Sequence, residues 1–335
     1  MERIVSDVIP VLDMEKADGG PRSRAEFLEQ LRAAVHDVGF FQLVGHKITD
    51  SDRLLELSRE FFALPERQLE EISILKSPHF RGYSETGRER TKGTPDHRRQ
   101  LDIGPELEPC VPGPGDPDYL WLAGPNQWPA SMPHLRTFLL DWARQLTGVS
   151  YRLIRLILAA VETPENFLDP VVTPDPHVHL KLLHYPGSDD TPENTQGIGV
   201  HKDLGLLTLL LQDDQGGLQV AVEEGEFIDV PHIPGAFVVN LGELLEVATR
   251  GYLRATTHRV VRPGPGVQRY SSPFFYNPCL HSTMQALPSR LVTQAAGVAH
   301  DPGNPLLASY GENVMKGMRR GFPEVVALHR SASRA

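Results

Sequence analysis

The chain has 335 residues, 40% of them hydrophobic and 23% charged, a composition typical of a globular protein. Its formal net charge of −10 argues against a nucleic acid or an anionic membrane surface as the main partner. Its two cysteines follow no zinc or redox spacing, and no apolar run approaches the roughly 20 residues of a membrane span. We therefore expect a cytoplasmic enzyme that binds neither nucleic acid nor membrane.

Short β-like runs and helical patterns alternate in the first part of the chain. Residues 8–12 form a short apolar run typical of a strand. Residues 22–39 place their apolar side chains on one helical face, and Gly39 supplies a stop signal. A second strand is predicted over residues 39–46, and the cap signals at Thr49 and Asp50 predict the start of a second amphipathic helix.

The pattern changes after about Asp175. Before this point, residues 133–161 predict a long helix with a break near Gly148. After it, short runs rich in Val, Ile, Leu, Thr, Phe and Tyr recur between Gly, Pro and Asp-Asp turn signals, which is typical of a sandwich or barrel. A helical pattern returns from about Asn304. The sequence therefore predicts a mainly β core with flanking α-helices, an α+β fold.

The stretch from Gly199 to Val220 begins with two side chains that are costly to bury without partners. His201 and Asp203 are two positions apart on a predicted strand, so they point to the same face. His258 lies in a second strand pattern, ATTHRVV. Two imidazoles and one carboxylate match the facial triad of non-haem Fe(II) oxygenases, which leaves positions open on the metal. Taken alone, an H-x-D pair is also compatible with ordinary half-buried residues.

A third feature, the sequence RYS, follows shortly after His258. Arg269 and Ser271 share one face of a predicted strand, so a guanidinium fork and a hydroxyl are directed to the same point. Such a pair binds a carboxylate well, because arginine can bind it bidentately with charge assistance. The alternative is an ion pair between Arg269 and an acidic residue of the chain.

Together, HKD, TTHRV and RYS resemble the isopenicillin-N-synthase-like family of Fe(II)- and 2-oxoglutarate-dependent dioxygenases. The segments DLGLLTLLLQDDQGGLQV, IPGAFVVNLGELLEVATRGYLRATTHRV and SSPFFYNP also look like core segments of that family. Near the N-terminus, VIPVLDM, GFFQLVGH, RGY and LDIG do so as well. The similarity spans nearly the whole chain.

The resemblance implies a double-stranded β-helix (jelly roll) that holds the metal in the cavity between two sheets. It implies one catalytic unit over residues 1–335. Within this unit, the expected parts are an N-terminal dioxygenase region at 8–120, a Fe(II)/2-oxoglutarate jelly-roll core at 176–283, and a C-terminal helix and tail at 304–335. We expect this last helix, with Met315, Met318 and Phe322 in the sequence YGENVMKGMRRGF, to cover the core rather than to mediate a dimer.

The resemblance also implies the iron ligands and the reaction. The ligands would be His201, Asp203 and His258, with Asn240 and Gly242 supporting the site or serving the fold. Fe(II), 2-oxoglutarate and O₂ would together oxidise a C–H bond of a small molecule and release succinate and CO₂. Hydroxylation is the expected outcome, with desaturation and ring closure as variants.

The co-substrate residues implied by the resemblance are Arg269 and Ser271, which would hold the distal carboxylate of 2-oxoglutarate. Tyr185 matches the family tyrosine that often helps to bind it. The family frequently has Asn-Tyr-Tyr-Pro here, whereas this chain has Leu183 and His184 in the first two places. A polar contact from the asparagine position is therefore missing.

The substrate pocket gives weaker signals. Residues 81–104 are rich in arginine in an otherwise acidic chain. They could form a solvated loop or an entrance lid that helps to hold an anionic small molecule. The resemblance implies that Phe275 and Ile103 line the pocket, with an ordinary core position as the alternative for each, and Arg99 is a further candidate.

Two other functions remain open from the sequence. An iron oxidase of the isopenicillin N synthase type would keep the Arg-x-Ser pair but would not use 2-oxoglutarate. A noncatalytic jelly-roll module would bind a small ligand and use the metal structurally, although structural metal sites usually close their coordination shell. We expect the protein to be a monomer.

Overall fold

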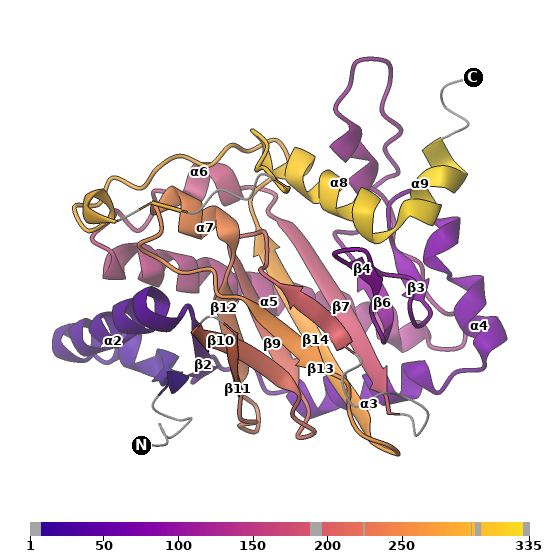
Figure 1. Cartoon of the computed structure of the whole chain (residues 1–335), viewed down its shortest axis with the longest axis horizontal. Helices are drawn as coiled ribbons and strands as arrows, with labels where there is room; N and C mark the ends of the chain where they lie inside the picture. The colour runs from indigo at the N-terminus through magenta and orange to yellow at the C-terminus, as the bar shows by residue number, and fades with distance from the viewer. Residues whose placement is uncertain (1–7, 188–195, 224, 296, 299–302, 331–335) are drawn as a thin grey trace.

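The computed structural model describes residues 8–187, 196–223, 225–295, 297–298 and 303–330. Two facing β-sheets form its centre, and helices cover the outside (Figure 1). The large sheet has eight strands, in the spatial order β1 (Val11–Asp13), β2 (Phe40–Val44), β12 (Phe237–Leu241), β9 (Leu207–Gln212), β14 (Gln268–Asn277), β7 (His177–Pro186), β6 (Arg99–Ile103) and β3 (Gly82–Ser84).

The small sheet has four strands, in the order β11 (Glu226–Asp229), β10 (Leu218–Glu223), β13 (His258–Val261) and β8 (Gln196–His201). A separate hairpin joins β4 (Arg90–Thr91) to β5 (Thr94–Pro95). All pairs in the two main sheets are antiparallel except the parallel pair β1–β2. Two packed antiparallel sheets with these crossovers form the jelly roll that the sequence predicts.

Side-chain alternation divides the core into two hydrophobic clusters. On β7, Leu182 packs toward the helices, whereas Leu183 lies between the two sheets with residues of β10 and β13. On β14, Phe274 and Tyr276 belong to the helix-side cluster. The strand period of two therefore turns the intervening residues of both strands into the space between the sheets.

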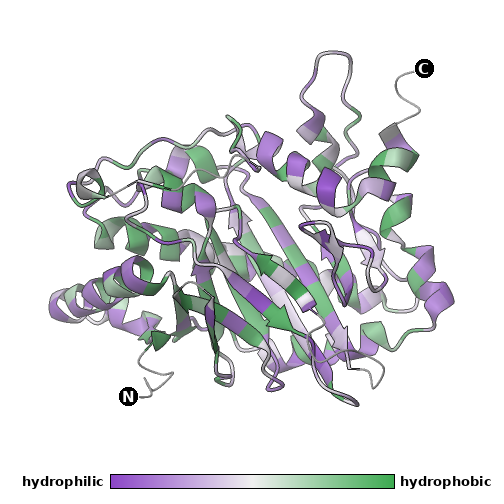
Figure 2. Ribbon diagram, in the orientation of Figure 1, coloured by the Kyte–Doolittle hydropathy of each residue, from purple (hydrophilic) through white to green (hydrophobic). Residues whose placement is uncertain are grey.

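Three helices contact strands of the large sheet and carry apolar faces of the helical period: α2 (Pro21–Ala33), α3 (Ser51–Phe62) and α5 (Pro133–Ala160). The shorter helices of this part of the chain are α4 (Glu66–Glu71), α6 (Asp169–Val172) and α7 (Glu243–Ala248). Figure 2 shows hydrophobic residues along the strands and hydrophilic residues over much of α2. No helix within the described ranges is long and apolar enough to cross a membrane.

The helix α5 runs without interruption, so the predicted break near Gly148 is wrong. Gly148 lies on the exposed side of α5, and no atom would contact a Cβ there. A single glycine costs a helix only about 1 kcal/mol, which the packing of the buried face offsets. The stop signal at Gly39 is confirmed: α2 continues into a short π-helical turn that ends at Gly39, whose φ is 72°.

The C-terminal helices α8 (Tyr310–Gly321) and α9 (Pro323–Arg330) lie over the end of the molecule that holds β3, β4 and β6 (Figure 1). Met315 and Phe322 are buried against residues of the N-terminal half. A capping box between Ser309 and Glu312 begins α8. The expectation that this helix covers the core agrees with its packing.

Two glycine substitutions should shift stability in opposite directions. Gly148→Ala should raise the free energy of unfolding by about 0.5–1 kcal/mol, because alanine favours the helix and meets no neighbour. Gly39→Ala should lower it by about 2 kcal/mol or more, because its Cβ would lie 2.2 Å from the Arg254 carbonyl oxygen at a positive φ. Urea unfolding of both variants measures the difference, and equal effects would contradict the local geometry.

Candidate functional site

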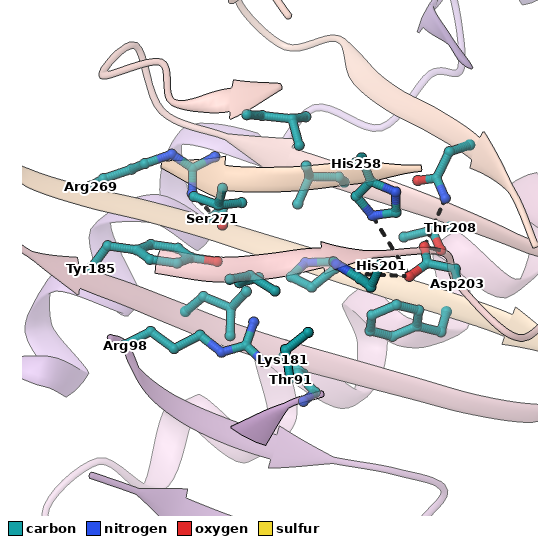
Figure 3. Close-up of a pocket in the computed structure, with 18 of the residues that line it drawn as sticks. Thr91, Arg98, Lys181, Tyr185, His201, Asp203, Thr208, His258, Arg269 and Ser271 are labelled. Atoms are coloured by element: carbon teal, nitrogen blue, oxygen red, sulfur yellow. Dashed lines mark hydrogen bonds and ion pairs between the residues drawn. The ribbon is translucent and has the colours of Figure 1, made fainter. Parts of the chain in front are cut away.

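Three potential metal ligands converge at one end of the space between the sheets. His201 ends β8, and β8 pairs with β13 so that His201 lies directly opposite His258. The Oδ1 atom of Asp203 is 3.7 Å from Nε2 of His201 and 3.8 Å from Nε2 of His258 (Figure 3). Within the described ranges, this is the one cluster of three histidine, cysteine or acidic side chains arranged to hold a metal.

Backbone carbonyl groups orient both imidazole rings. Nδ1 of His201 lies 2.8 Å from the Gly199 oxygen, and Nδ1 of His258 lies 3.1 Å from the Thr256 oxygen. A carbonyl oxygen can only accept, so Nδ1 carries the proton in each ring and Nε2 presents a lone pair to the cavity. Burial, followed by the proximity of His258, lowers the pKa of His201 to about 4, which keeps this ring neutral at physiological pH.

Two side chains orient the carboxylate of Asp203. Its Oδ2 atom accepts hydrogen bonds from Thr208 Oγ1 at 2.5 Å and from Asn240 Nδ2 at 2.7 Å, which leaves Oδ1 directed at the histidines. Burial alone would raise the pKa of Asp203, but the two histidines and these hydrogen bonds outweigh it and lower the pKa. Gly242 packs closely against the backbone of Gly205, two residues after Asp203. A Cβ at Gly242 would lie 2.2 Å from the Gly205 oxygen, so this close approach requires glycine.

A cavity of about 220 Å³ extends from this triad between the sheets. Its walls include alternate residues of β7 and β14, as strand geometry requires. They are Lys181, Leu183, Tyr185, Arg269, Ser271, Pro273 and Phe275.

Arg269 lies at the end of the cavity opposite the triad (Figure 3). It is 0% exposed and donates to the Gly216 oxygen at 2.5 Å, to Ser271 Oγ at 3.1 Å and to Gln212 Oε1 at 3.2 Å. Among the residues that the structure describes, no carboxylate forms an ion pair with this guanidinium. The alternative of a salt bridge within the chain is therefore not observed.

Tyr185 stacks beside this guanidinium, with the Arg269 Cζ atom 4.8 Å from its ring centre. Tyr185 is fully buried, and its hydroxyl is directed into the cavity but has no hydrogen-bond partner in the described part of the chain (Figure 3). A buried hydroxyl without a partner is costly, so this position suits a ligand that accepts a hydrogen bond.

Of the three predicted substrate residues, only Phe275 lines the cavity. Ile103 is buried in the helix-side cluster, and Arg99 contacts His184 at 2.8 Å and the Phe62 ring. Both side chains lie on the helix-facing side of β6. The neighbouring Arg98 enters the cavity instead.

A polar wall that the sequence reasoning missed lies near Phe275. Glu89 accepts from Lys181 Nζ at 2.9 Å and from Arg98 at 2.6 Å, and all three residues line the cavity. Lys181 also lies 3.3 Å from Asp102. The sequence offered one indication of this wall, the alternation of side chains along β6. Leu101 and Ile103 lie on its apolar face, so Asp102 and the preceding Arg98 are expected on the opposite face.

The arginine-rich segment 81–104 is folded rather than a solvated loop. Arg81 is fully buried and donates to the backbone oxygens of His79 and Leu122. Arg88 pairs with Glu324 of α9. The segment therefore contributes both to the core and, through Glu89 and Arg98, to the cavity wall.

Comparisons with known proteins agree with this geometry. A model of the N-terminal region of the non-haem dioxygenases in morphine synthesis matches residues 9–131, and a model of the 2OG-Fe(II) oxygenase superfamily matches residues 176–278. A homoarginine-6-hydroxylase of Arabidopsis thaliana is 35% identical over 78% of this chain and 80% of its own length. A 2-oxoglutarate-dependent dioxygenase of a Dothideomycetidae species is 35% identical over 84% of this chain and 77% of its own.

Solved structures agree as well. A 2OG-Fe(II) oxygenase family protein of Caulobacter crescentus has a TM-score of 0.75 and 27% identity, covering 93% of this chain and 98% of that one. A Neurospora crassa protein in complex with alpha-KG and thymine has a TM-score of 0.74 and 27% identity, with 97% of both chains covered. The chain therefore belongs to the Fe(II)- and 2-oxoglutarate-dependent oxygenases.

The enzyme accordingly uses Fe(II), 2-oxoglutarate and O₂ to oxidise a small molecule, as the sequence predicts. Its relatives are named as 2-oxoglutarate-dependent enzymes, so the oxidase without 2-oxoglutarate and the noncatalytic module are not supported. The residues present also fit these groups, because two imidazoles and one carboxylate suit Fe(II), and a buried guanidinium beside an unpartnered hydroxyl suits a carboxylate.

Removing the support of Asp203 should weaken metal binding. Asn240→Ala should lower Fe(II) affinity about 10–100-fold, because the carboxylate loses a hydrogen bond that fixes its orientation. Anaerobic titration with Fe(II) measures this change. The matched control is Asn313→Ala, another buried asparagine with hydrogen bonds in α8, which should lower the melting temperature without changing Fe(II) affinity. Equal Fe(II) affinities of the two variants would contradict the assigned role.

His184 should make stability depend on pH. Burial, followed by the charge of Arg99, lowers its pKa to about 4, although Gln268 partly opposes the shift. Between pH 6.5 and about 4, the unfolded chain therefore binds a proton that the folded chain does not, so the free energy of unfolding falls as pH falls. Urea unfolding at several pH values should show a shallower decline for His184→Gln, and identical slopes would contradict this origin.

Proposed function

We propose that His201, Asp203 and His258 hold the iron and that Arg269, Ser271 and Tyr185 hold 2-oxoglutarate, while the enzyme hydroxylates a small polar molecule. The observation that carries this proposal is a fully buried guanidinium, without a carboxylate partner among the described residues, at the opposite end of the cavity from the triad. A dicarboxylic acid that spans the cavity would satisfy both ends.

The protein groups bind and orient the reactants. Arg269 and Ser271 would donate to the distal carboxylate, and the Tyr185 hydroxyl would gain the partner that it lacks. When bound, the iron and 2-oxoglutarate supply the oxidising chemistry, in which O₂ and the co-substrate yield succinate, CO₂ and the oxidised product. Leu183, Leu210 and Val260 line the intervening walls and would keep water out.

The ion pair of Lys181 and Glu89 in the cavity wall favours a charged or strongly polar substrate. An apolar substrate would cover the ammonium group of Lys181 and the carboxylate of Glu89 without offering either a new partner. The modest cavity must also hold 2-oxoglutarate, which favours a substrate about the size of an amino acid or a nucleobase. Relatives named for homoarginine and a neighbour solved with thymine support this class.

We further propose that residues 1–335 act as one catalytic unit and as a monomer in the cytoplasm, without a nucleic-acid or membrane partner. The net charge of −10 supports this view. So does the burial of Met315 and Phe322 of the C-terminal region within the chain itself. Strands from the N-terminal region extend both edges of the sheet that contains β7 and β14.

A substrate screen tests the proposed class. With Fe(II) and 2-oxoglutarate present, succinate release should be stimulated by amino acids, guanidino acids or pyrimidines, but not by apolar terpenoids or fatty acids. Lys181→Met should raise KM for the stimulating compound about tenfold or more, while the affinity for 2-oxoglutarate stays unchanged. Stimulation by apolar compounds alone, with no effect of Lys181→Met, would overturn the substrate class.

A further inference from the structure

A second guanidinium in the cavity has an unsatisfied donor. Arg98 precedes β6, is 7% exposed and lies between Tyr185 and Lys181 (Figure 3). Its Nε atom is buried and has no hydrogen-bond partner within the described ranges, as is true of the Tyr185 hydroxyl. Two unsatisfied polar atoms in one cavity, one on β7 and one directly before β6, indicate a ligand rather than a packing defect.

Two carboxylates hold Arg98 at one nitrogen, and its charge also lies close to Tyr185. Its Nη2 atom donates to Glu89 at 2.6 Å and lies 3.4 Å from Asp96. Asp96 is itself fixed by Thr91 Oγ1 at 2.8 Å and by the Gly199 backbone N–H at 3.3 Å. The guanidinium is therefore oriented in advance, with its Nε side free to donate.

Arg98 keeps its charge inside the cavity. Burial would lower its pKa, but Glu89, Tyr185 and Asp96 together raise it, so the group stays charged. Figure 3 shows its guanidinium part of the way along the cavity, between Arg269 and the triad residues.

We propose that Arg98 donates to the keto-acid end of 2-oxoglutarate, opposite the carboxylate that Arg269 holds. This inference rests on the proposed function of the cavity. 2-Oxoglutarate is a dianion, and burying its second carboxylate requires charge-assisted donors besides the metal. Leu183, the nearest cavity-facing residue between Tyr185 and Lys181 on β7, offers none. Arg98, directly before the adjacent strand β6, provides this donor.

Two 2-oxo acids separate the roles of the two arginines. Pyruvate has the keto-acid end of 2-oxoglutarate but lacks the distal carboxylate. Anaerobic titration of the Fe(II)-loaded protein, followed by the visible charge-transfer band of the bound 2-oxo acid, gives the Kd of each compound without turnover. Arg98→Met should raise the Kd of both compounds about 10–100-fold. Arg269→Met should raise the Kd of 2-oxoglutarate alone, and Arg98→Lys should be intermediate because it keeps the charge without the fork.

The outcomes distinguish this inference from the proposed function. Unchanged Kd values in Arg98→Met, with an altered KM for the substrate, would overturn the inference and move Arg98 to the substrate side. Absence of the band in the wild-type protein with both compounds would instead contradict the proposed function itself. If Arg98→Met does not fold, a crystal structure of the wild-type chain with Zn(II) and 2-oxoglutarate decides, because a separation beyond hydrogen-bonding distance from the co-substrate would reject the contact.

Discussion

The ladder between β7 and β14 is the constraint on which the site depends. These two strands pair over almost their whole length, with Arg269 opposite Tyr185 and Phe275 opposite His179. A slip of β14 by one residue relative to β7 would turn Arg269 toward the helices and bring Phe274 into the cavity, away from Tyr185. Both faces of the sheet are buried, so the hydrophobic packing that stabilises the fold also fixes which polar groups meet between the sheets.

Charge is placed in this interior only where partners compensate for it. Glu89 forms ion pairs with Lys181 and Arg98. Asp102 lies 2.9 Å from His179 Nε2 and 3.3 Å from Lys181 Nζ. Among the cations that line the cavity within the described ranges, Arg269 is the exception, since its contacts are to neutral groups. A cation that is fully buried among neutral acceptors favours the binding of an anion beside it. The co-substrate of this family, 2-oxoglutarate, is such an anion.

The sequence predicted the triad, the Arg-x-Ser pair and the layered β core, because short-range strand parity and recurring motifs carry that information. It did not predict the partners of Lys181, since Glu89 and Asp102 reach it through strand pairing between distant segments. The same limit explains Arg99: the excess of arginine was visible, but the face of β6 on which each residue lies depends on tertiary packing. At Gly148 the error ran the other way: the low helix propensity of glycine predicted a break, but the packing of the buried face keeps α5 continuous.

The packing of the C-terminal helices has a consequence for how this enzyme can diversify. A side chain at Gly321, at the end of α8, would contact Glu89, because its Cβ would lie 3.7 Å from Glu89 Cγ. The ring of Phe322 lies 6.0 Å from Lys181 Nζ. The tail of the chain thus borders the polar wall, while the triad residues come from β8, the segment after it and β13. Mutations near the C-terminus can therefore alter the surroundings of Glu89 and Lys181 during evolution and leave the triad strands intact, so that new selectivities arise at little risk to the oxidative chemistry.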